Sequence, residues 1–284
     1  ALFLNLWKPK KKWPAWVGYL IIIGAWFAAI RYYILNQVDL YGTMYYPLMN
    51  LFRTESYGFL FGLFLAIPIF IVLGLLYWAV NKIWSKTPEE NRTGRRAFFR
   101  TAATVVPLAT IGSSSYAAYV GQHEIEVTHE SFGYTNLPSG LKDYKIVQLS
   151  DIHVGPSIDL DDLDEILKLA LVEKPNRVVI TGDLIDKLAW LPQVCERLTT
   201  FAKQIPDGVD FILGNHEYHH DVNKVLEELK HNTPMNILVN SNIQIMGGKQ
   251  PVYIAGVAYD NDREKEKREA MIDKALSGIP DYAF

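Results

Sequence analysis

The chain has 284 residues, a length that suits one large domain or two smaller ones. Its net charge of −3 is unevenly distributed: residues 1–120 carry 12 Lys and Arg against 4 Asp and Glu, whereas residues 121–284 carry 16 against 27. The second region lacks a broad basic patch, which argues against nucleic acid as a partner, and a single cysteine excludes an intrachain disulfide. We therefore expect two regions in two physical environments.

Residues 1–120 are expected to form a membrane region. Residues 57–80 are an uncharged run long enough to span a bilayer, and Pro68 near its middle predicts a kink that membrane helices tolerate. Residues 14–35 form a second candidate span, whose only charge, Arg31, can reach the membrane interface.

Residues 101–120 form a third uncharged run, which is richer in Ala, Ser and Thr. The segment before it, residues 93–100, contains Arg95-Arg96 and resembles a twin-arginine export signal, and the small residues near 115–117 would allow cleavage. Two interpretations stay open: a third membrane helix with a basic flank, or an export signal. Two or three transmembrane helices are therefore expected.

The positive charges alternate between the segments that flank these runs. Four lysines lie within residues 8–12, Arg53 is the only Lys or Arg of loop 36–56, and loop 81–100 carries six Lys and Arg residues. The positive-inside rule then places everything after residue 120 outside the cytoplasm, and the assignment inverts if the third run does not cross. We therefore expect the acidic domain on the extracytoplasmic side of the membrane.

From residue 121 the pattern changes to short strands that alternate with amphipathic helices. This alternation predicts an α/β sandwich. The expected strands are residues 123–129, 145–150, 177–181, 210–213, 236–239 and 252–256, and the expected helices are residues 159–167, 191–205, 221–231 and 262–276. Cys195 falls in the second helix, where we interpret it as a small buried apolar residue rather than a reactive thiol.

Three polar blocks follow three of these strands directly. They are Asp151-Ile-His153, Gly182-Asp183 and Gly214-Asn215-His216-Glu217. Loops that follow parallel strands meet at one rim of a sheet, so we expect carboxylate, imidazole and carboxamide groups to gather there. That chemistry suits two divalent metal ions clamped around a phosphate ester.

The blocks resemble the calcineurin-like metallophosphoesterase superfamily, whose motifs are D-x-H, G-D and G-N-H followed by E or D. The membrane helices and the twin-arginine-like stretch are similar to its membrane-anchored bacterial branch. The resemblance covers residues 123–284 and implies a four-layer α-β-β-α sandwich that binds two divalent metal ions of the Mn, Fe or Zn type.

The resemblance also implies a role for each site residue. Asp151 and His153 would hold one metal, Asp183 would bridge both, and Asn215 would hold the second. His216 would face the phosphate as an acid or a stabiliser of charge. Hydrolysis would then proceed through a metal-activated hydroxide, which attacks phosphorus in line. Asp186 and Glu217 are expected to hydrogen-bond the metal residues.

The family completes its site with further histidines, one after a later strand and a pair in a G-H-x-H block. No His follows Gly256 in this chain. We expect the protein to continue beyond Phe284 rather than to have lost these ligands, so the domain at 121–284 is predicted to be truncated.

The expected function is therefore a membrane-anchored, dinuclear-metal phosphoesterase acting on phosphate mono- or diesters. Lipid-linked or nucleotide-sugar-lipid phosphodiesters are the expected substrates. The alternative is a catalytically silent subunit of a membrane assembly that contacts partner proteins through its N-terminal helices. A soluble nuclease of the same superfamily fits poorly with the apolar run at 57–80.

Overall fold

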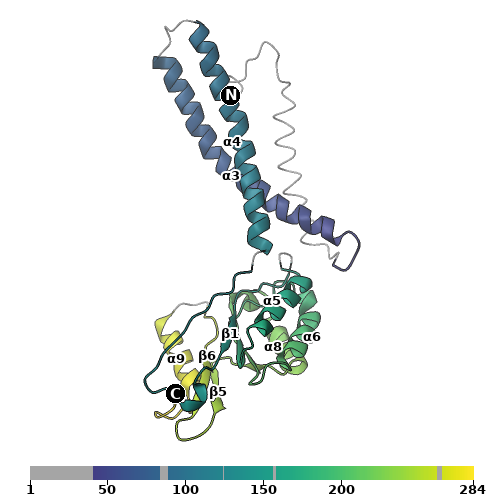
Figure 1. The fold of residues 1–284 in the computed structure, drawn as a ribbon, viewed down its shortest axis with the longest axis vertical. Helices are drawn as coiled ribbons and strands as arrows, with labels where there is room; N and C mark the ends of the chain where they lie inside the picture. The colour runs from purple at the N-terminus through teal and green to yellow at the C-terminus, as the bar shows by residue number, and fades with distance from the viewer. Residues whose placement is uncertain (1–40, 84–88, 124, 156–157, 261–263) are drawn as a thin grey trace. The chain divides into compact units, whose positions relative to one another are not determined.

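The computed structural model describes residues 41–83, 89–123, 125–155, 158–260 and 264–284 (Figure 1). The chain separates into two compact units, Ala1–Glu124 and Ile125–Phe284, and each is described by itself. The candidate span at residues 14–35 lies outside the described residues.

The described part of the first unit contains two long helices, α3 (Tyr46–Ile83) and α4 (Glu89–His123). The segment Gly58–Ile83 of α3 is long and apolar enough to cross a membrane, with a mean hydropathy of 2.8, and no other described helix passes the same test. This segment coincides with the span expected at 57–80. Residues 101–120 lie inside α4, which is a continuous helix from Glu89 onward.

Small residues allow α3 and α4 to approach closely. A Cβ atom on Gly58 would lie 2.4 Å from the Cα atom of Ser115, and one on Gly62 would lie 2.6 Å from the Cα atom of Ile111. Ala66, one further turn along α3, is fully buried. Only 19% of the apolar window of α3 is buried within the structure. Close backbone packing with apolar side chains facing outward is typical of helix pairs in lipid.

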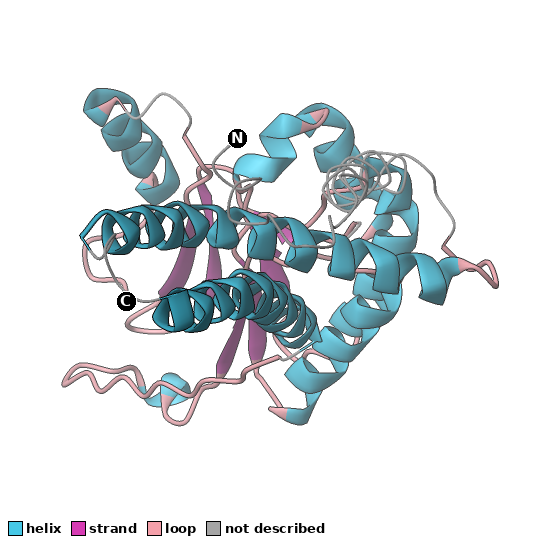
Figure 2. Ribbon diagram, turned by 90° about the horizontal axis from the view of Figure 1, so that it is seen from above, coloured by secondary structure: helices cyan, strands magenta, loops and turns pink. Residues whose placement is uncertain are grey.

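The second unit is built on a parallel sheet with the strand order β1-β2-β3-β4 (Figure 2). Its strands are β1 (Ile146–Leu149), β2 (Arg177–Ile180), β3 (Val209–Phe211) and β4 (Asn236–Ile237). The connecting helices are α5 (Leu160–Val172), α6 (Leu191–Ala202), the short α7 (Asn215–His219) and α8 (Val222–Asn232). The strands follow one another in chain order across the sheet, as repeated β-α-β units do. The expected α/β architecture with a parallel sheet is confirmed.

Local sequence signals explain where the helices begin and which faces they bury. Asp159 accepts hydrogen bonds from the backbone nitrogens of Asp161 and Asp162, and Asp162 accepts one in return from the backbone nitrogen of Asp159. These reciprocal bonds form a capping box at the first turn of α5. In α6, Cys195 is 1% exposed, and burial raises the pKa of its thiol to about 12. The interpretation of Cys195 as a buried apolar residue is confirmed.

A second, two-stranded sheet follows β4. Its strands, β5 (Ser241–Met246) and β6 (Val252–Gly256), are antiparallel, and helix α9 (Lys265–Leu276) packs against both of them. The turn between them contains Gly248, whose φ of 120° is one that L side chains rarely adopt. Strand β5 was not expected from the sequence, although residues 242–245 alternate polar and apolar side chains.

The strand predicted at 123–129 is wrong. His123 ends α4, residues 125–130 have no regular structure, and both Ile125 and Val127 are more than 40% exposed. Alternation of polar and apolar residues is a local pattern, whereas a strand also needs a neighbour for its backbone hydrogen bonds. Within the described residues, no strand pairs with this segment.

Candidate metal centre

The first two polar blocks run side by side beyond the ends of β1 and β2. The backbone nitrogen of Asp151 donates to the oxygen of Gly182 at 3.3 Å, and that of His153 donates to the oxygen of Asp183 at 2.8 Å. The nitrogen of Val154 then donates to the oxygen of Leu184 at 2.9 Å. Backbone pairing thus holds the two blocks at one rim of the sheet, as their positions after parallel strands predict.

Three of the expected metal ligands have left-handed backbone conformations. The φ angles of Asp151, His153 and Asp183 are 54°, 53° and 52°. Such angles cost L residues about 1–3 kcal/mol each and gather at functional sites, and Asp and His adopt them more readily than most residues. The paired backbones of the two blocks hold these turns in place.

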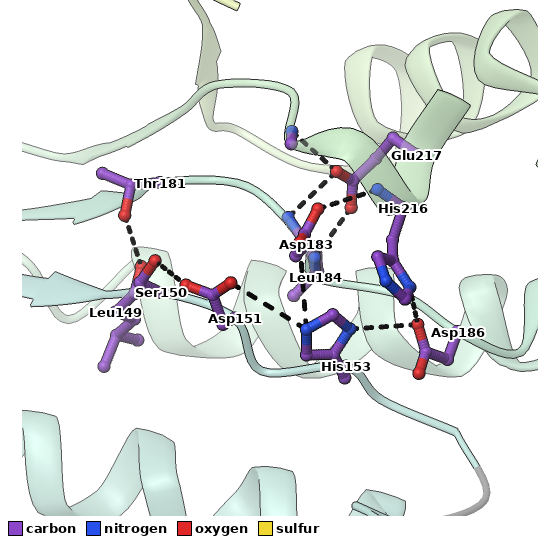
Figure 3. Close-up of polar contacts among 11 residues, drawn as sticks. Leu149, Ser150, Asp151, His153, Thr181, Asp183, Leu184, Asp186, His216 and Glu217 are labelled. Carbon is purple, nitrogen blue, oxygen red and sulfur yellow. Dashed lines mark hydrogen bonds and ion pairs between the residues drawn. The ribbon is translucent and has the colours of Figure 1, made fainter. Parts of the chain in front are cut away.

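Glu217 joins the second and third blocks through backbone hydrogen bonds. Its side chain is fully buried, and it accepts hydrogen bonds from the backbone nitrogens of Asp183 at 3.0 Å, Leu184 at 2.7 Å and Gly214 at 2.8 Å (Figure 3). Charge-assisted bonds from backbone donors stabilise a buried carboxylate. The expectation that Glu217 supports the site residues is confirmed.

A compact donor group lies next to these hydrogen bonds. Ligand atoms of His153, Asp183 and His216 all lie within 4.8 Å of one another, and this group can hold a metal ion. His153 Nε2 is 3.8 Å from Asp183 Oδ2 and 3.9 Å from Asp151 Oδ1. Carboxylate and imidazole donors suit divalent ions such as Mn, Fe and Zn. The residues present therefore fit a divalent cation.

Asp186 orients both imidazoles of the group with a single oxygen atom. Its Oδ1 is 3.1 Å from His153 Nδ1 and 2.6 Å from His216 Nδ1 (Figure 3), and the two rings lie 4.2 Å apart at 73°. A carboxylate that accepts from Nδ1 fixes the tautomer and leaves Nε2 free to bind a cation or an oxyanion. The expected hydrogen bonding by Asp186 is confirmed.

The other expected site residues lie at the margin of the donor group. The side chain of Asp151 is 66% exposed, and its carboxylate accepts a hydrogen bond from Ser150. Asn215 is half-buried and is the first residue of α7. The ring of His219 lies 5.1 Å from that of His216. His219 is the last residue of α7, and His220 follows it as the C-cap, directly before Asp221, the N-cap of α8.

The third block also touches the segment that follows β6. The backbone nitrogen of Tyr259 donates to the oxygen of Leu213 at 3.0 Å, and the ring of Tyr259 lies 6.5 Å from that of Tyr218 in α7. Burial, followed by the charges of Asp260 and Glu217, raises the pKa of Tyr218 above its ordinary value. Sequence reasoning missed this contact because nothing in the motifs links residue 259 to residue 213.

The profile of the family described as calcineurin-like phosphoesterase matches residues 144–277. This segment of the chain is thus similar to the calcineurin-like phosphoesterase family. Because metallophosphoesterases use divalent metals, the family match agrees with the donor group formed by His153, Asp183 and His216.

Proteins named as metallophosphoesterases are similar to this chain over parts of their length. An uncharacterized metallophosphoesterase of Campylobacter jejuni is 40% identical over 110 residues, which are 38% of this chain and 29% of that protein. The metallophosphoesterase YkuE of Bacillus subtilis is 30% identical over 45% of this chain and 46% of its own length. A transmembrane protein with metallophosphoesterase domain from Bos taurus is 28% identical over 51% of this chain and 31% of its own. The matched segments thus span less than half the length of these relatives.

Proposed function

We propose that this protein is a membrane-anchored, dinuclear-metal phosphoesterase that hydrolyses phosphate mono- or diesters. The observation that carries the proposal is the donor group of His153, Asp183 and His216, held at the rim of a parallel sheet by Asp186 and Glu217. The calcineurin-like phosphoesterase match over residues 144–277 supports the same reaction class.

The metal-holding residues proposed are those that the resemblance implies. Asp151 and His153 would hold one divalent ion, Asp183 would bridge two, and Asn215 would contribute to the second. When bound, such ions acidify water and neutralise charge on phosphoryl oxygens. Asp183 suits the bridging position because only 6% of it is exposed. Its Oδ1 already accepts from the backbone nitrogen of His216 at 2.8 Å, which fixes the direction of the carboxylate.

His216 would bind and stabilise the phosphoryl group. Asp186 holds its Nδ1 at 2.6 Å, so Nε2 is the nitrogen that can face a phosphate oxygen. A donor aimed where negative charge develops in the transition state lowers the barrier, and loss of one such donor costs about 10²–10³ in rate. Asp186 acts through the two imidazoles, so it is a positioning residue.

The membrane and the substrate class belong to the same proposal. Gly58–Ile83 supports an anchor in the bilayer, and relatives named as transmembrane proteins exist in Bos taurus and Danio rerio. The distribution of Lys and Arg supports a domain on the extracytoplasmic side, and the resemblance to the membrane-anchored bacterial branch suggests the bacterial inner membrane with the domain on its periplasmic side. Lipid-linked or nucleotide-sugar-lipid phosphodiesters would then be the natural substrates. The β5–β6 pair would belong to the second sheet of the four-layer sandwich.

Hydrolysis of bis(p-nitrophenyl) phosphate by the purified full chain with added Mn²⁺ tests the reaction class. We expect turnover that Asp183→Asn abolishes, because the substitution removes the charge shared by two cations. Asp273→Asn, a change at an exposed position of α9, is the matched control and should leave turnover unchanged. Equal turnover by the wild type and Asp183→Asn would refute the proposed mechanism.

Metal analysis separates the enzyme from a catalytically silent subunit, which the intact donor group does not favour. We expect two equivalents of bound metal in the wild type and fewer in Asp183→Asn. Reporter fusions after residues 40, 86 and 124 test the topology: the expected pattern is outside, inside and outside. Cytoplasmic activity of the third fusion would overturn the extracytoplasmic assignment.

A further inference from the structure

A cavity of about 500 Å³ opens beside the third block of the site. Its walls are residues 257–260, which follow β6, together with Arg268, Met271 and Ile272 of α9. Most of these side chains are apolar or aromatic, and the two charged ones are Asp260 and Arg268. Cavities of this size and composition hold organic ligands in proteins.

The cavity lies within reach of the metal-binding residues. The nitrogen of Tyr259 donates to the oxygen of Leu213 at 3.0 Å, and the next residue, Gly214, is so close to Asp183 that a Cβ atom there would lie 2.1 Å from Asp183 Oδ1. With standard backbone dimensions, these contacts place Tyr259 N no more than about 10 Å from Asp183 Oδ1. A phosphate held at the metal centre can therefore extend a substituent of moderate length to the cavity wall.

The wall is better suited to an aliphatic chain than to a polar head group. Ala258 is only 5% exposed, and Met271 is half-buried. Ile272 is 44% exposed although it lines the cavity. Met271 and Ile272 therefore leave apolar surface at the cavity wall, and a ligand that covers it gains the free energy of apolar burial.

We propose that this cavity binds the alkyl or acyl chain of a phosphoester whose phosphate lies at the metal centre. The inference rests on the proposed function, because the phosphate must bind at His153, Asp183 and His216. It deepens that function by assigning the specificity for lipid-like substrates to Tyr259, Met271 and Ile272. Chain burial there would position the phosphorus atom rather than take part in the chemistry.

Binding of octyl phosphate and methyl phosphate to the Mn²⁺-loaded full chain, measured by calorimetry, tests the proposal without requiring turnover. Each buried methylene is worth roughly fourfold in affinity, so burial of even part of the chain should make octyl phosphate at least about tenfold tighter. Ile272→Glu should reduce this preference to about onefold, and Ile272→Ala should reduce it less.

Leu276→Glu is the matched control, since Leu276 is an apolar residue of α9 that is 50% exposed and does not line the cavity. It adds the same charge to the same helix and should keep the preference. No preference in the wild type, or a preference that survives Ile272→Glu, would overturn the proposal. If the preference behaves as expected but bis(p-nitrophenyl) phosphate is not hydrolysed, the reaction class is wrong and the chain-binding cavity stands.

Discussion

Gly182 and Gly214 pack so closely that a Cβ atom on Gly182 would lie 2.4 Å from the backbone nitrogen of Gly214. In the reverse direction, a Cβ atom on Gly214 would collide with the carboxylate of Asp183. Gly182 belongs to the block that follows β2, and Gly214 belongs to the block that follows the neighbouring strand β3. Their contact brings the third block against Asp183, so their place in the motifs reflects a steric need rather than chemistry.

Gly182→Ala should therefore destabilise the domain and weaken metal binding together. The φ of Gly182 is 90°, which costs an L residue about 1–2 kcal/mol, and forced overpacking adds about 1–3 kcal/mol. We expect a loss of roughly 2–5 kcal/mol in the free energy of unfolding, measured by urea denaturation.

Gly208→Ala separates the two causes of this loss. Gly208 has nearly the same φ, 91°, but nothing lies within 4 Å of its Cβ position. It should show the backbone cost alone and keep normal metal affinity. Equal losses in both variants would show that the close approach of Gly182 to Gly214 has no energetic importance.

Asp186→Asn should lower metal affinity and turnover by about 10–100-fold, the usual effect of removing a hydrogen-bond partner of a metal-site histidine. The carboxamide keeps the shape of the side chain but supports His153 and His216 less strongly, because it lacks the charge. Metal titration followed by calorimetry measures the affinity. Separate values of kcat and KM show whether the substitution affects turnover or the binding of the phosphate substrate. Unchanged affinity with Asp186→Asn would mean that the rings are oriented by packing alone.

The sequence predicted that the three blocks meet at one rim of the sheet, and the role of their residues as metal ligands stays a prediction. Asp151, Asp183 and Asn215 follow strands in a parallel sheet, and topology alone then brings them to one rim. For Asp186, the sequence predicted only a hydrogen bond to a metal residue, because it does not show that His153 Nδ1 and His216 Nδ1 meet at one of its oxygen atoms.

The failures have a common physical origin. Residues 123–129 alternate as a strand does, but backbone pairing, which periodicity does not record, decides whether such a segment becomes one. Helix α7 has five residues, fewer than two turns, so no helical period can be read from it. Its existence depends on Glu217, whose carboxylate accepts from the nitrogen of Gly214 and caps the helix from within.

Glu217→Gln should destabilise the domain by about 2 kcal/mol or more. The carboxylate accepts three backbone N–H groups with both oxygens, and an amide nitrogen in place of either oxygen leaves at least one buried donor unpaired, at about 1–3 kcal/mol each. Urea denaturation measures the effect, with Glu196→Gln at an exposed position of α6 as the control. A loss no larger than that of the control would show that Glu217 does not hold the two blocks together.

Cys195 should resist alkylation in the folded protein. Burial raises the pKa of its thiol from 9.0 to about 12, so the nucleophilic thiolate is scarce at pH 8. The thiol has a higher pKa in the folded protein than in the unfolded chain. Its contribution to the free energy of unfolding is therefore complete below pH 9 and is lost as the pH rises toward 12. Mass spectrometry should show slow iodoacetamide labelling in buffer and rapid labelling in urea. The labelling reports on Cys195 alone, because the chain has a single cysteine. Labelling in buffer at the rate of free cysteine would contradict the burial of α6 against the core.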